Sequence, residues 1–389
     1  MRIVIPWGPH ERTGLSSGNS RFHDWRQVYR LTVPTTGAVL TDLGRKTAHN
    51  VLPGGRRNFH PRSWSLPVLG VTGALGSCCV LIGVLQPGSP FVSHASTAWL
   101  FSSSAASLSR GESIRQFLGV MLVYLGIALL LGSWLEALRA VRLGKPREVR
   151  RLIPLLVAWA APLLFAPPLF SRDVYSYAAQ GEMLSKGINP YFHGPSVLGS
   201  STFVKAVDPL WLHATAPYGP VWERLSQWVV EMSGHSAVTS VFGFRLIALA
   251  GVTFVAWGAP ELARSIGRDR GATFVLTVLN PVVLLVLLGG CHNDVLMLGL
   301  LVTALVMASR RYLILGLICC ALAAEVKAPA IVAAAFIGWT WSNRSTLRQR
   351  VARTSAALAS TIAVMTLVGV ACRLGWRWVA DLFGAGTVV

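Results

Sequence analysis

Long apolar runs separated by short polar segments dominate this chain from residue 66 onward. As a helix, a run of about 20 apolar residues crosses the roughly 30 Å hydrocarbon core of a bilayer. About nine runs are predicted as transmembrane or membrane-embedded helices: residues 66–85, 117–138, 152–169, 237–262, 272–290, 295–309, 312–324, 328–341 and 354–372. The predicted fold class is therefore all-α, a polytopic integral membrane protein. Asn280-Pro281 breaks the fifth run.

The first 65 residues do not follow this pattern. They are polar and basic, rich in Gly, Pro, Ser and Arg, and they lack the apolar core of a signal peptide. Such a segment has too few apolar residues to bury a core of its own. We therefore predict a disordered, basic cytoplasmic tail over 1–65 and a polytopic membrane domain over 66–389.

Composition strengthens the membrane prediction. Hydrophobic residues make up 53% of the 389 residues and charged residues only 13%. Lys and Arg number 35 against 16 Asp and Glu, a balance that in a soluble protein would suggest nucleic acid. Here the cations cluster between the apolar runs, which favours retention beside a membrane and predicts no nucleic-acid partner. The six cysteines form no Cys-x-x-Cys pair and are expected to be small buried hydrophobes.

The densest basic cluster, RAVRLGKPREVRR at 139–151, separates the second and third runs. Loops rich in Lys and Arg stay on the cytoplasmic side, so this cluster fixes an orientation. It predicts a multi-pass plasma-membrane protein with a cytoplasmic amino terminus and a large outer loop over 171–236. Three polar clusters then share the outer side: a helix that starts at Asp173, the triplet His292-Asn293-Asp294, and Glu325 with Lys327.

The outer loop opens with a predicted helix over 173–185. Asp173, Tyr177 and Gln180 share one face of it by their i, i+4, i+7 spacing. Gly187 and Asn189-Pro190 are expected to end the helix and turn the chain. A carboxylate beside aromatic rings and amides could accept the proton of a sugar hydroxyl. The alternative is that Asp173 only complements the helix dipole.

The remaining candidates each have two interpretations. Three cations could neutralise a donor phosphate, namely Arg172, Lys327 and Arg245. Lys327 could instead pair with Glu325, and the other two could anchor or snorkel to the interface. The triplet at 292–294 could contact acceptor hydroxyls, or cap the helix that follows it. Tyr191 and Tyr218 could stack on sugar faces or belong to the interface. No cofactor or metal site is predicted, a cation shared by two aspartates being the weaker alternative.

Several function classes are disfavoured by what the chain lacks. It has no Walker loop, no Gly-x-Gly-x-x-Gly after a strand and no His-Glu-x-x-His. Charges within the runs are few, which argues against an ion-coupled transporter with a midplane site. Enzymes with outer-face carboxylates cannot use cytoplasmic nucleotide sugars, so their donors are sugars on polyprenyl phosphate. An outer-face, lipid-dependent transferase is therefore favoured over a transporter or a structural membrane protein.

Short motifs in a fixed order add a resemblance. They are RDVYSYAAQG at 172–181, NPY at 189–191, VDPLW at 207–211, APYGP at 216–220, NP at 280–281, HND at 292–294 and VKAP at 326–329. From about residue 66 to the end, the chain resembles actinobacterial polyprenol-phosphate-mannose-dependent α-(1→6)-mannosyltransferases, which belong to the C-type glycosyltransferase superfamily. Those enzymes build the mannan backbone of lipomannan and lipoarabinomannan.

The resemblance implies a polyprenyl-phosphate-mannose donor and a lipid-anchored mannan acceptor, among membrane lipids. It implies that Asp173 is the base-like carboxylate and that the other motifs, with Asp208 in the second half of the loop, line the donor and acceptor cleft. The alternatives are a transferase of another polyprenyl-linked sugar such as arabinofuranose, an inactive remnant, or a lipid-binding transporter. Family members continue beyond the ninth run, so the chain is predicted to be C-terminally incomplete.

Overall fold

The computed structural model describes residues 65–92, 110–142, 148–341 and 346–384. Every regular element within these ranges is helical, as the sequence predicts, and no strand occurs among them. The predicted cytoplasmic tail lies outside the described residues apart from residue 65. The segment between the first two predicted runs, residues 86–116, is described only in part.

Four helices in the described part of the chain are long and apolar enough to cross a membrane. They are α1 (Leu66–Val84), α2 (Arg110–Arg142), α7 (Ala237–Ser265) and α12 (Leu347–Ala371). Each coincides with a predicted run. Three shorter helices follow the runs between 295 and 341, namely α9 (Asp294–Ser309), α10 (Leu313–Val326) and α11 (Val332–Thr340), the last preceded by the 3₁₀ turn η7 (Ala328–Ile331).

The two other predicted runs are interrupted rather than continuous. The run at 152–169 forms α3 (Val149–Ala160) and then a 3₁₀ turn, η3 (Pro162–Phe165). The run at 272–290 forms α8 (Arg270–Thr277) and, after Asn280-Pro281, a π-helical segment, η6 (Val283–Leu288). Proline lacks the N–H that a continuing helix needs, which accounts for both breaks. Backbone groups freed at such breaks need partners inside the protein, because lipid offers none.

The segment predicted as a large outer loop is mostly short helices. These are α4 (Asp173–Ser185), η4 (Pro195–Leu198), α5 (Thr202–Ala206), η5 (Pro209–Trp211) and α6 (Pro220–Met232). Helix α4 has the predicted bounds, and Gly187 follows its end with a φ of 75°. Of the two tryptophans on helix α6, Trp228 is exposed and Trp222 is buried.

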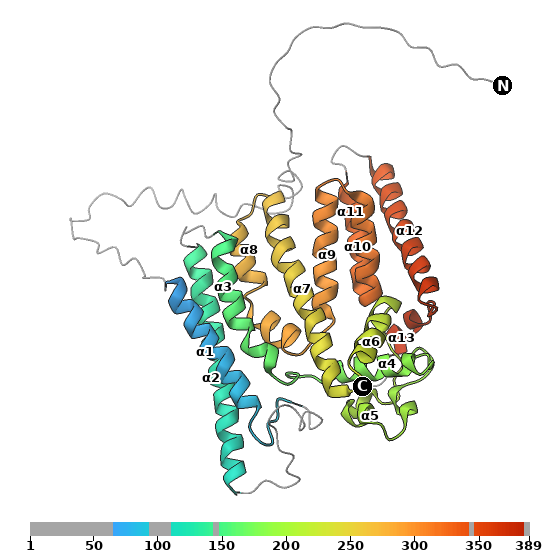
Figure 1. Cartoon of the computed structure of the whole chain (residues 1–389). Coiled ribbons are helices and arrows are strands. Elements are labelled where there is room, and N and C mark those ends of the chain that lie inside the picture. Colours follow the sequence, from blue (N-terminus) through green and yellow to red (C-terminus); the bar gives the residue numbers. More distant parts are fainter. Residues whose placement is uncertain (1–64, 93–109, 143–147, 342–345, 385–389) are drawn as a thin grey trace, which may run out of the picture. The chain divides into compact units, whose positions relative to one another are not determined.

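Helices α7, α9, α10 and α12 form a row in which each contacts the next (Figure 1). Helices α4, α5, α6 and the short α13 (Trp378–Gly384) gather at the same end of these four helices, at the bottom of the view. Helix α4 contacts α6 and α7, and its residues from Val174 to Leu184 are all buried. The segment that carries the predicted catalytic helix is therefore an integral part of the core rather than a free loop.

Helices α1 and α2 pack through two reciprocal pairs of glycines. A Cβ built on Gly126 would lie 2.5 Å from the carbonyl oxygen of Gly76, and one on Gly76 would lie 2.8 Å from that of Gly126. Gly83 and Gly119 form a second pair of the same kind, with 2.6 Å and 2.8 Å to each other's carbonyl oxygens. Small residues let helix backbones approach closely, and in lipid this contact is a main source of helix association.

We expect Gly126→Ala to destabilise the protein, because the new methyl group would overlap the backbone of α1. Overpacking of this kind typically costs about 1–3 kcal/mol. Thermal unfolding in detergent should therefore show a lower midpoint. Gly132→Ala is the matched control on the same helix, since no atom lies within 4 Å of a Cβ built there. Equal midpoints for the two variants would contradict the close approach of α1 and α2.

Candidate functional site

Two charged pairs lie where α4, the turn before α9 and the end of α10 meet. Asp173 Oδ2 lies 3.4 Å from His292 Nδ1. Lys327 Nζ donates to both carboxylate oxygens of Asp294, at 2.8 and 2.9 Å. The side chains of Asp173, Asp294 and Lys327 are each about one third exposed. The structure thus brings residues from all three predicted polar clusters together, and solvent reaches Asp173, Asp294 and Lys327.

The alternative that Lys327 pairs with Glu325 is wrong. Helix α10 ends at Val326, and Lys327 adopts an extended conformation that directs its ammonium group to α9. Glu325 lies on the helix proper and is 1% exposed, close against the turn before α6. A Cβ built on Gly219 in that turn would lie 2.3 Å from the Glu325 carbonyl oxygen. The two residues therefore belong to different environments despite their spacing.

Arg245 holds together the two interrupted runs that lead to the site. Its guanidinium donates to the carbonyl oxygens of Leu164 in η3, at 2.9 Å, and of Gly289 after η6, at 3.2 Å. The Leu169 N–H donates to the same Gly289 oxygen, at 3.2 Å. Arg245 is 2% exposed, so it neither snorkels to the surface nor faces the open site. Its role in this structure is to position the segments that carry Asp173 and His292.

The turn before α9 aims His292 toward α4. Cys291 adopts a φ of 57°, which is uncommon for a residue other than glycine. Gly290 is also required there, because a Cβ on it would lie 2.9 Å from the His292 ring and 3.0 Å from the Leu169 carbonyl oxygen. The backbone conformation is thus strained where the imidazole meets Asp173. Such strain is often found at functional sites.

A cluster of aromatic side chains packs around Tyr177 on α4, the helix that begins at Asp173. The Tyr177 ring packs edge-to-face on Tyr218, Trp222 and Phe244, with centroid distances of 5.3, 4.9 and 5.9 Å. Its hydroxyl makes a long hydrogen bond, 3.4 Å, to Asn293 Oδ1. Burial, with smaller contributions from Tyr218 and Asp173, raises the pKa of Tyr177 well above its usual value. Tyr177 is therefore a neutral support for α4 rather than a surface on which a sugar stacks.

The other residues predicted to line the cleft differ in burial and in their hydrogen-bond partners. Arg172 is half-exposed beside Asp173, whereas Gln180 is buried. Tyr191 is fully buried, and its hydroxyl donates to the Tyr218 carbonyl oxygen at 2.8 Å. Asp208 caps η5 by accepting from the Leu210 N–H at 3.0 Å. Of these four, only Arg172 combines charge, exposure and closeness in sequence to Asp173.

No group of three or more His, Cys, Asp or Glu side chains in the described ranges is arranged to hold a metal ion. The two aspartates that could share a cation are Asp173 and Asp294, and each has a different partner, His292 for Asp173 and Lys327 for Asp294. Within the described ranges, the charged groups of the site form two pairs, Asp173 with His292 and Lys327 with Asp294.

Sequence reasoning missed Glu223, a buried acid on the first turn of α6. Its side chain is 0% exposed, and neither carboxylate oxygen has a hydrogen-bond partner in the described structure. Burial raises the pKa of Glu223 well above its usual value, so the group folds as a neutral acid. In the sequence it looks like an ordinary acidic residue near a helix start, which is favourable at the surface. Only the packing of α6 reveals it.

We expect Glu223→Gln to stabilise the protein increasingly as the pH rises. The unfolded chain releases this proton above about pH 4.5, whereas the folded chain retains it. Between those two pKa values the wild type loses about 1.4 kcal/mol per pH unit relative to the glutamine variant. The difference in unfolding midpoint in detergent should therefore be larger at pH 8 than at pH 5. Glu231→Gln, at an exposed position of the same helix, is the control; a pH-independent difference for Glu223→Gln would contradict the buried neutral acid.

The comparisons with known proteins agree with this arrangement. A family model described as the N-terminal domain of alpha-(1->6)-mannopyranosyltransferase matches residues 70–343. Alpha-(1->6)-mannopyranosyltransferase A of Mycobacterium tuberculosis is 31% identical, over 82% of this chain and 61% of its own length. A probable alpha-(1->6)-mannopyranosyltransferase of Mycolicibacterium smegmatis is 32% identical, over 81% of this chain and 61% of its own length. Alpha-(1->6)-mannopyranosyltransferase B of Corynebacterium glutamicum is 26% identical, over 82% and 57%.

The long apolar helices are those of a membrane protein, and the matched family model and relatives are those of glycosyltransferases. More particularly, the chain belongs to the alpha-(1->6)-mannopyranosyltransferase family, whose N-terminal domain it contains. It spans about three fifths of the length of the relatives named. No solved structure shows significant similarity to it.

Proposed function

We propose that this chain transfers mannose from polyprenyl-phosphate-mannose to a growing α-(1→6)-mannan on the outer face of the plasma membrane. The observation that carries the proposal is the pair of Asp173 and His292, 3.4 Å apart and open to solvent, beside the pair of Lys327 and Asp294. A base and a cation lie next to each other, as transfer from a phosphate-linked sugar requires. Family membership supports mannose as the sugar.

Asp173 is the general base in this proposal. A sugar hydroxyl is a poor nucleophile near neutral pH, and a base within hydrogen-bond reach removes its proton as the new bond forms. The carboxylate acts late, when positive charge grows on the donor sugar and the hydroxyl becomes acidic. His292, beside one carboxylate oxygen, orients the group and leaves the other oxygen to the acceptor. Asp173 thus receives the proton that the acceptor loses.

Lys327 and Arg172 are the proposed contacts of the donor phosphate. The polyprenyl phosphate leaves as an anion, so it needs neighbouring positive charge rather than a proton. The two hydrogen bonds to Asp294 fix the position of the Lys327 ammonium group, and about a third of this side chain stays exposed. Arg172 immediately precedes the base in sequence and is half-exposed. Together they would hold the leaving group on the side opposite the incoming hydroxyl.

A single base implies direct displacement with inversion. The attacking oxygen forms its bond to the anomeric carbon while the bond to the phosphate oxygen breaks, and no enzyme-linked sugar is formed. A β-linked donor would then give an α-linked product. The proposal requires no second carboxylate as a nucleophile, in agreement with the pairing of Asp294 to Lys327.

We expect Asp173→Asn to reduce mannosyl transfer about 10²–10⁴-fold, because the amide keeps the shape and cannot take the proton. Transfer is measured in membranes containing the chain, from labelled polyprenyl-phosphate-mannose to a short α-(1→6)-mannoside. Asp269→Asn is the matched control, since Asp269 caps α8 far from the site and asparagine caps equally well. It should leave the rate unchanged.

Three outcomes would contradict the proposal. Near-normal transfer by Asp173→Asn would show that Asp173 is not the general base. A product that kept the β configuration of the donor would exclude direct displacement. No transfer by the unchanged chain would refute the activity for this chain. Bound donor should still be detected in the variant, which separates loss of chemistry from loss of folding.

The proposed orientation has its own test. Ser200 is exposed at the end that carries α4 and α6, and Arg348 is exposed at the start of α12, at the opposite end (Figure 1). Each is replaced singly by cysteine in a chain without its six native cysteines. We expect a membrane-impermeant thiol reagent added to intact cells to label Ser200→Cys and to reach Arg348→Cys only after lysis. Labelling of both in intact cells would reject the proposed orientation.

A further inference from the structure

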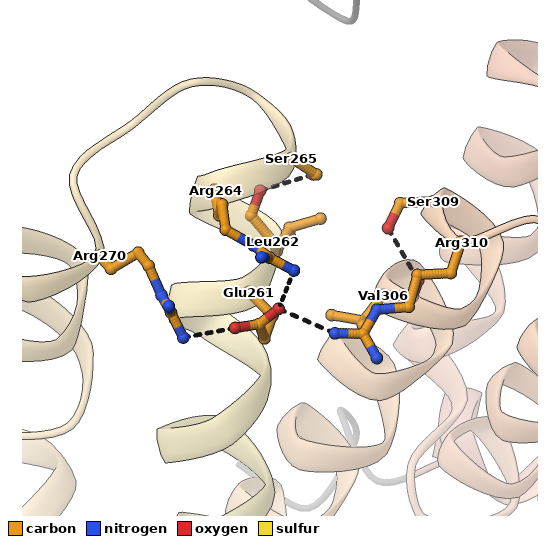
Figure 2. A network of polar contacts seen from close by, with 8 residues as sticks. All are labelled: Glu261, Leu262, Arg264, Ser265, Arg270, Val306, Ser309 and Arg310. Carbon is orange, nitrogen blue, oxygen red and sulfur yellow. Dashed lines mark hydrogen bonds and ion pairs between the residues drawn. The ribbon is translucent and has the colours of Figure 1, made fainter. Parts of the chain in front are cut away.

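One carboxylate joins the ends of three helices at the end of α7 opposite the site. Glu261 accepts hydrogen bonds from three arginines (Figure 2): Arg264 on the same helix, Arg270 at the start of α8, and Arg310 just after α9. The first and last donate to the same oxygen, each at 2.8 Å, and Arg270 donates to the other. We call these four residues the Glu261 cluster.

The Glu261 cluster carries more positive charge than its internal pairing neutralises. Three guanidinium groups surround a single carboxylate, which leaves a net charge of +2. The Glu261 side chain is 10% exposed, whereas those of Arg264, Arg270 and Arg310 are 62%, 48% and 41% exposed. A guanidinium has five N–H donors, and the hydrogen bonds to Glu261 use one nitrogen of each. Donors therefore remain on the exposed side of all three.

An exposed apolar surface adjoins the cluster. Trp257 lies one turn before Glu261 on α7 and is 40% exposed, and Phe254 is 39% exposed. The Arg310 guanidinium lies 5.6 Å from the centroid of the Trp257 ring. Tryptophan beside arginine is typical of the level at which lipid headgroups meet the hydrocarbon. The positive charge thus lies directly above a surface that suits acyl chains.

We propose that the Glu261 cluster binds the phosphate of an anionic membrane phospholipid. The guanidinium groups would donate to the phosphate oxygens, and the acyl chains would lie along Trp257 and Phe254. Arginine is suited to this because its planar fork matches phosphate geometry. The hydrogen bonds to Glu261 already tie the three helix ends together, but the single carboxylate neutralises only one of the three positive charges. The proposal is independent of the mannosyl transfer.

The test uses the detergent-solubilised chain and native mass spectrometry. Phosphatidylglycerol is added against phosphatidylcholine of the same acyl chains, and we expect the anionic lipid to be retained preferentially. Arg264→Gln and Arg310→Gln should each weaken its binding roughly fivefold, the value of one cation near a lipid surface. Arg268→Gln is the matched control, because Arg268 is an exposed arginine of the adjoining loop outside the cluster. It should leave binding unchanged.

A second variant distinguishes lipid binding from a structural tie. Glu261→Gln raises the charge of the cluster from +2 to +3, so the proposal expects tighter binding of phosphatidylglycerol and a larger rise in unfolding midpoint when it is added. If the cluster only ties helices together, the variant is less stable and the lipid does not restore it. That outcome, or equal loss of binding with Arg268→Gln, overturns the proposal. Equal stabilisation by millimolar inorganic phosphate would assign the site to free phosphate instead.

Discussion

The site depends on the carbonyl oxygen of Gly289. It accepts hydrogen bonds from the Arg245 guanidinium and from the Leu169 N–H, and Arg245 also binds the Leu164 carbonyl oxygen. These groups are freed where two apolar runs stop being regular helices. In a bilayer these groups need hydrogen-bond partners within the protein. The Arg245 guanidinium supplies them, and its own burial is stabilised by the same hydrogen bonds. Because Leu169 leads to Asp173 and Gly289 leads to His292, the same contacts bring the Asp173 carboxylate and the imidazole together.

The features that follow from local pattern were predictable. Gly187 and Asn189-Pro190 end α4 where the sequence indicates, and four of the apolar runs form long helices. Features that follow from tertiary contact were not. Sequence spacing offered Glu325 as one possible partner of Lys327, yet the chain leaves its helix between them and the ammonium group reaches Asp294. Burial of Glu223 depends on how α6 packs, which no local pattern encodes.

Helix α7 contacts the candidate site near its first end and the Glu261 cluster near its last end. Phe244, which packs on Tyr177 beneath the site, and Glu261, which holds three arginines, are 17 positions apart in the sequence. At 1.5 Å per residue this is about 26 Å, close to the thickness of a hydrocarbon core. The spacing agrees with a helix that crosses a bilayer. It also separates the sugar chemistry we propose from the lipid headgroup site, so that each can be altered without the other.

The glycine contacts of α1 and α2 have a consequence for the order of assembly. Both helices belong to the first part of the membrane domain to be synthesised, and their contacts are made by neighbouring segments of the chain. Such a hairpin can associate as soon as its second helix has entered the bilayer, before the site exists. Helix α3 then docks onto it, because the Trp159 ring fills the space that the absent side chain of Gly73 leaves. The early hairpin thus offers α3 a packing surface before the later helices are made.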